Sequence, residues 1–139
     1  MIELRSHTQA ERQPLAGACV QCISPYLNPA HILSPPRDWL EGLVEGDCSW
    51  SLFRLRYKAL LRARFRADAE PFFALLQAAE GTLVLTCHCM AGPCHLDLAK
   101  DFLLRLRDQT PHEQWAALRR RLTLFPLPVE HPALALRHG

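Results

Sequence analysis

The sequence lacks any apolar run that approaches the ~20 residues of a membrane-spanning helix. Its first residues, Met1 to Arg5, carry charge where a secretory signal would be apolar. A strong charge imbalance is also missing, because 16 Lys and Arg stand against 14 Asp and Glu, which gives a net charge of +2. These absences predict a soluble cytoplasmic protein without a membrane partner. Any anionic partner would have to be bound by a local cluster of basic residues.

The chain has 139 residues, 49% of them hydrophobic, which fits one domain over residues 1–139 with a core of its own. Its six cysteines are unevenly placed. Cys19 and Cys22 form a C-x-x-C pair, Cys48 stands alone, and three more fall within residues 87–94. In a reducing compartment such clustering favours metal or thiol chemistry over a disulfide framework.

Hydrophobic periodicity predicts an α/β fold with a small, mostly parallel sheet flanked by helices. The best strand is 82–87, which is short and continuously apolar as a buried central strand should be. Residues 1–5 and 18–23 are further strand candidates, and the four prolines of 24–36 indicate an irregular loop. Helices are expected at 50–65, 69–79, 97–106 and 111–121, with a helix entry at 34–40 and a Pro-rich tail at 126–139.

The order strand, loop, helix places the segment Thr86 to His95 at the carboxyl end of the central strand. Open α/β sheets bind their ligands there. Cys94 and His95 fall where the next helix starts, and its free N–H groups favour a thiolate or a bound anion. We therefore expect this segment to be the functional centre.

Two chemistries compete for this segment. As a metal site, its ligands would be Cys87, Cys89, Cys94 and His95, with His88, Cys19 or Cys22 as other sources of the fourth ligand. Zinc prefers such sulfur and nitrogen sets, and iron is the other candidate.

As a thiol-dependent enzyme, Cys94 would be the nucleophile, with His95 or His88 as the base and the helix start stabilising negative charge. In a third interpretation the protein is a non-catalytic interaction protein and the loop only a rigid turn. If Cys19 to Ile23 is a strand, Cys19 and Cys22 point to opposite faces, which argues against a shared metal.

Arg54, Lys58 and Arg62 recur at four-residue steps in the helix predicted at 50–65, which contains no acidic residue. Arg56, Arg64 and Arg66 widen this stripe. We interpret Arg54, Lys58 and Arg62 as candidate contacts to the phosphates of a nucleotide or nucleic acid. The alternative is a solvated helix face whose long side chains cover apolar neighbours.

The stretch from Trp50 to Leu106 resembles two related groups, domain of unknown function 488 and domain of unknown function 4326. Their shared pattern is F-x-x-x-Y-x-x-x-L, matched here by Phe53, Tyr57 and Leu61, then an apolar strand and a loop that ends in Cys94-His95. The doublet Cys87-x-Cys89 and the run Cys94-His95-x-Asp97 look closer to the second group, and Leu96 stands where the first group usually has Arg. The resemblance implies a compact α/β fold with the Cys-His loop as its site. It also implies an association with nucleic-acid or nucleotide metabolism.

Overall fold

The computed structural model describes residues 1–88 and 94–122. Its three strands, β1 (Ile2–Ser6), β2 (Cys19–Cys22) and β3 (Leu83–Cys87), form a parallel sheet in the order β1-β3-β2. Every residue of β3 is buried, which confirms the predicted central strand. Both N-terminal strand candidates are strands as well.

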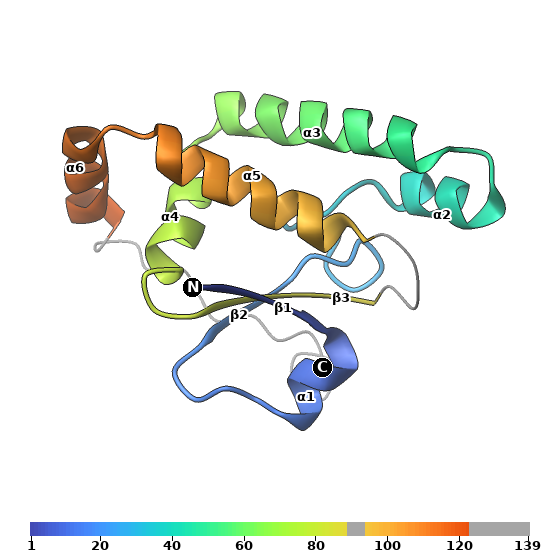
Figure 1. Ribbon diagram of the computed structural model, residues 1–139, viewed down its shortest axis with the longest axis horizontal. Helices are drawn as coiled ribbons and strands as arrows, with labels where there is room; N and C mark the ends of the chain where they lie inside the picture. Colours follow the sequence, from blue (N-terminus) through green and yellow to red (C-terminus); the bar gives the residue numbers. More distant parts are fainter. Residues whose placement is uncertain (89–93, 123–139) are drawn as a thin grey trace.

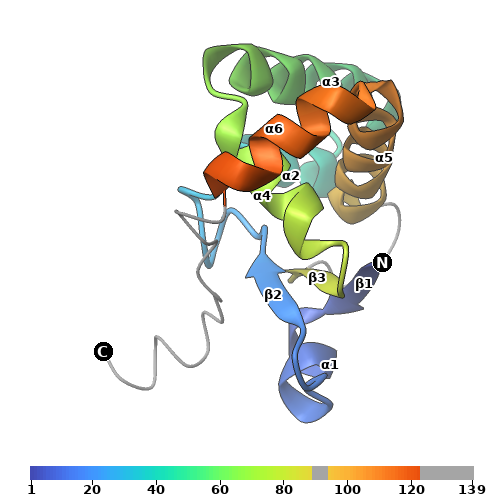
Figure 2. The same ribbon diagram turned by 90° about the vertical axis from the view of Figure 1, so that its left-hand side faces the viewer.

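Helices cover the sheet on both faces (Figures 1 and 2). The short α1 (His7–Arg12) lies on one face, and the other helices lie on the opposite face. These are α2 (Arg37–Glu45), α3 (Trp50–Ala67), α4 (Glu70–Ala78), α5 (His95–Gln109) and α6 (His112–Leu122). The α/β fold predicted from the sequence is thereby confirmed. Over residues 1–88 and 94–122, no helix has the length and apolar character to cross a membrane.

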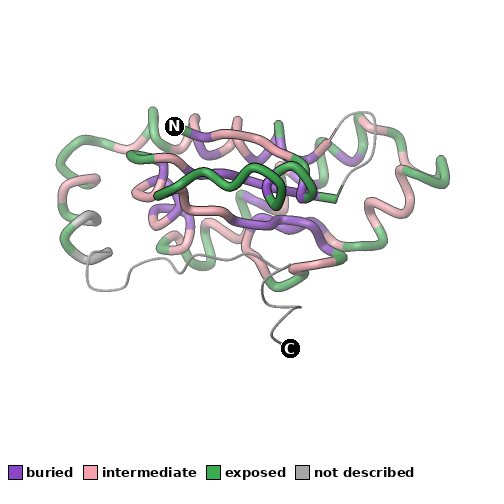
Figure 3. The backbone as a smooth tube through the Cα atoms, turned by 90° about the horizontal axis from the view of Figure 1, so that it is seen from below, coloured by how far each residue is buried: buried purple, intermediate pink, exposed green. Residues whose placement is uncertain are grey.

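The longest helix, α3, begins where its sequence provides a cap. The Ser49 hydroxyl accepts the Leu52 N–H at 3.2 Å, which satisfies one of the free donors at the helix start. Phe53, Tyr57 and Leu61 follow at four-residue spacing and are fully buried. Each such side chain contributes about 1.5–3 kcal/mol on burial. This face therefore anchors α3 on the core. Seen from below, the buried positions gather toward the middle of the molecule (Figure 3).

The loop of residues 24–36 is held by side chains of α3 rather than by secondary structure of its own. The Tyr57 hydroxyl donates to Leu33 O at 2.6 Å. Arg64 donates through Nη1 to Ile32 O at 2.8 Å and to Ser34 O at 2.7 Å. Burial raises the pKa of Tyr57 and lowers that of Arg64. Arg64 therefore has a structural role here, although the sequence placed it in the basic stripe.

Replacing Arg64 with Met should lower the free energy of unfolding by about 2–3 kcal/mol, because two carbonyls lose a charged donor. Arg62→Met is the matched control, since Arg62 is exposed on the same helix. It should change stability by no more than about 0.5 kcal/mol. Urea denaturation of both variants measures the difference. Equal midpoints would show that the loop does not depend on Arg64.

Candidate functional site

The carboxyl ends of the three strands meet at one edge of the sheet. Ser6 pairs with Cys87, Cys22 pairs with Thr86, and Ile23 N donates to Thr86 O at 2.8 Å just beyond β2. β1 leads into α1 on one face, whereas α5 follows β3 in sequence on the other (Figure 1). Neighbouring parallel strands whose connections leave to opposite faces open a crevice between them, and such crevices bind ligands in open α/β sheets. Cys87 lies at this position.

Cys94 is the N-cap residue of α5. Its backbone is extended, with φ −124° and ψ 147°, and its Sγ accepts the Leu96 N–H at 3.5 Å. The side chain of Cys94 is half-buried, whereas Cys87 is buried, and the two sulfur atoms are 3.1 Å apart. The positive end of the α5 dipole adds to the stabilisation of negative charge at this sulfur. The structure therefore brings together the two ends of the predicted loop.

His95 is fully buried and makes a hydrogen bond that shows which ring nitrogen donates. Its Nε2 lies 2.8 Å from Ile23 O. A carbonyl oxygen only accepts, so Nε2 carries a proton, and in the neutral form of the ring the lone pair lies on Nδ1. Nδ1 faces Cys94 Sγ at 3.9 Å. The ring of Tyr57 meets the imidazole edge-on, with centroids 5.9 Å apart. His95 can thus accept a proton from Cys94 through Nδ1.

The predicted metal ligands are only partly placed by the structure. Cys94 lies near both Cys87 and His95, but Cys89 lies outside the described residues. In the part of the chain that is described, three ligand side chains do not converge on one metal position. Cys19 and Cys22 belong to β2, three residues apart, and therefore point to opposite faces of the sheet.

Two histidines lie at the same edge of the sheet. The rings of His7, the first residue of α1, and His88, which follows β3, have centroids 6.1 Å apart. His7 is buried, with Nε2 3.6 Å from Glu11 Oε1. From the sequence, His88 is predicted as an alternative ligand or base, whereas His7 is not predicted. The feature that could have indicated His7 is its position directly after the predicted N-terminal strand.

The predicted phosphate contacts divide into two places. Lys58 and Arg62 line a groove between α3 and α5. Arg54 is exposed and is not among the described residues that line this groove. None of the three lies among the residues placed at the carboxyl edge of the sheet.

Comparisons with known proteins identify no relative that could help to interpret this site. No family model, curated protein or solved structure matches the chain. The resemblance to the two domain families therefore stays a prediction, and the site is interpreted from its own geometry.

Substituting His95 with Leu should cost about 1–3 kcal/mol of unfolding free energy, because the buried Ile23 carbonyl loses its donor. His112→Leu is the control, since that histidine is exposed on α6. Chemical denaturation compares the two variants. Equal stability of both would mean that His95 does not hold α5 against the end of β2.

Proposed function

We propose that this protein is a thiol-dependent enzyme in which Cys94 is the nucleophile and His95 the general base. One observation carries the proposal: Cys94 Sγ accepts the Leu96 N–H at the start of α5 and lies 3.9 Å from His95 Nδ1, while His95 Nε2 lies against Ile23 O. All the groups such a centre needs are among the described residues. They are a partly exposed thiol, a base of fixed tautomer and backbone donors that stabilise charge.

The reaction would run as a nucleophilic displacement. His95 Nδ1 takes the thiol proton while Sγ forms a bond to an electrophilic carbon or phosphorus atom of the substrate. The bond to the leaving group breaks, and the leaving group receives that proton from His95. Water, activated by the same imidazole, then releases the product and restores the thiol. The Leu96 N–H and the α5 dipole stabilise negative charge in both steps.

The substrate class we propose is a nucleotide or a nucleic acid. A helix start is suited to phosphate because its N–H groups and dipole both face the anion. The basic residues of α3 support the same class of partner, since Lys58 and Arg62 face α5 along its groove.

A metal site is the second candidate, favoured by the 3.1 Å between the sulfur atoms of Cys87 and Cys94. Two thiolates bound to one tetrahedral zinc at about 2.3 Å lie roughly 3.8 Å apart. The two sulfur atoms would therefore need to move only slightly apart to bind the ion. Cys87 and Cys94 would be ligands, and His95 would have to shift to join them, because three described ligand side chains do not converge on one position. Cys89 would complete the predicted set. Zinc, or iron in its place, would stabilise the thiolates and hold the loop.

The thiol proposal predicts selective alkylation of Cys94 by iodoacetamide at neutral pH. Cys48 is the internal control, because it is also half-buried and also precedes a helix, but its sulfur donates to Ser49 O at 3.4 Å and caps nothing. We expect Cys94 to react roughly tenfold faster than Cys48. Tandem mass spectrometry of the labelled peptides measures both rates in one sample. Equal rates would contradict an activated nucleophile.

Elemental analysis of the purified protein separates the two candidates. Under the thiol proposal Cys94 is alkylated rapidly in protein with negligible zinc and iron. One equivalent of either metal, lost in Cys87→Ser with a fall in stability, would replace the thiol proposal by the metal site. Metal-free protein with a slowly alkylated Cys94 would favour the non-catalytic interaction protein.

A further inference from the structure

A concave groove lies between α3 and α5, outside the thiol site. It has a volume of about 390 Å³. Its walls carry Lys58, Arg62 and Arg66 from α3 and Arg105 from α5, and its apolar lining includes Phe65 and Phe102. The two helices run alongside each other above the sheet (Figure 1).

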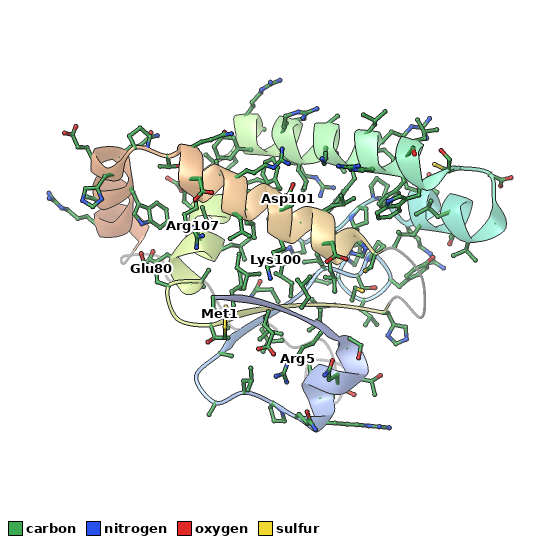
Figure 4. All side chains as sticks on the ribbon, in the orientation of Figure 1. Met1, Arg5, Glu80, Lys100, Asp101 and Arg107 are labelled. Atoms are coloured by element: carbon green, nitrogen blue, oxygen red, sulfur yellow. The ribbon has the colours of Figure 1, made fainter. Side chains whose placement is uncertain are left out.

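The charges of this α3–α5 groove are unbalanced. Four cations line it against one carboxylate, Asp101, which bonds Arg105 Nε at 3.1 Å. Figure 4 shows Asp101 in the gap between α3 and α5, with Lys100 on the other edge of α5. Lys58, Arg62 and Arg66 make no ion pair with any residue in the described ranges. Three positive charges therefore remain for an anionic occupant.

The apolar lining gives the groove a second chemical character. Phe65 and Phe102 are each half-buried, and both pack against the buried Phe72, at centroid distances of 5.6 Å. The core thus holds both rings from behind. A cationic groove with aromatic rings in its lining matches what single-stranded nucleic acid offers, namely phosphates along a backbone and bases that stack.

We infer that the α3–α5 groove binds single-stranded nucleic acid. Lys58 and Arg66 are two helical turns apart, about 12 Å along α3, which suits successive phosphates of a strand better than one mononucleotide. A duplex hides its bases, and a lipid surface favours apolar groups that protrude rather than line a groove. The inference rests on the proposed function for the class of partner, but not on the reactivity of Cys94.

The position of the groove connects it to the thiol site. Its lining begins at Leu98, one turn along α5 from Cys94, or about 6 Å along the helix axis. A strand seated in the groove and continuing toward the start of α5 would bring a further nucleotide to Cys94. Binding in the groove and reaction at Cys94 would then act on one substrate.

Fluorescence anisotropy with a labelled oligothymidylate of about 12 nucleotides, a length within the site sizes of single-strand binders, tests this inference. The protein is the full chain carrying Cys94→Ser, so that thiol chemistry does not enter. We expect a Kd of roughly 10⁻⁶–10⁻⁴ M at physiological salt. With three or four phosphate contacts, log K should fall against log salt with a slope of about −2 to −3.

The pair Arg62→Glu with Arg66→Glu should weaken binding by at least about tenfold, and circular dichroism checks that its fold is intact. Arg54→Glu is the matched control, since it changes an exposed arginine of the same helix outside the groove. It should change Kd less than about twofold. An equal loss in both would show that general charge, not the groove, holds the strand.

Three further outcomes would overturn the inference: no binding at low salt, tighter binding of a duplex, or tighter binding of anionic vesicles. Measuring alkylation and binding in the protein without substitutions keeps the two proposals apart. Rapid alkylation of Cys94 without oligonucleotide binding there would reject the groove alone. Oligonucleotide binding with slow alkylation of Cys94 would reject the thiol enzyme alone.

Discussion

The hydrogen bond from His95 Nε2 to Ile23 O is the interaction on which the candidate site depends. It joins the start of α5 to the end of β2 across a buried interface, at 2.8 Å. A buried imidazole without a partner would be costly, so this bond determines both where the ring lies and which nitrogen carries its proton. The lone pair of Nδ1 then faces Cys94 as a consequence of packing. The same bond therefore stabilises the fold and would orient His95 for the chemistry that we propose at Cys94.

The support for this bond comes from α3. Tyr57 contacts the imidazole edge-on with its ring and donates its hydroxyl to Leu33 O, in the loop that follows Ile23. Arg64, two turns further along, holds the neighbouring carbonyls of that loop. One helix thus positions both His95 and the loop beside its acceptor. The tyrosine ring and the histidine, which are distant in sequence, are therefore in contact.

The sequence predicted the elements better than their contacts. Burial of a continuous apolar segment identifies β3, and four-residue spacing identifies the inward face of α3, since both depend on local periodicity. Arg64 bonds two backbone carbonyls of the irregular loop 24–36, and His95 bonds the carbonyl of Ile23 at the end of β2. These partners lie 30 or more residues away in sequence, and periodicity carries no information about them. Arg64 therefore looked like one more cation of a stripe. His95 was recognised as a site residue, but its acceptor and tautomer required the fold.

The two proposed sites use different properties of one helix. The start of α5 supplies N–H donors and a positive dipole end at Cys94, whereas its side facing α3 supplies Phe102 and Arg105 to the groove. Because a helix is rigid over such a distance, a ligand bound along the groove has a defined position relative to the sulfur. Reaction then requires no separate phosphate pocket beside Cys94. An anionic strand aligned by the groove would gain its reactivity from orientation. Orientation can lower the activation free energy far more than one additional charge contact does.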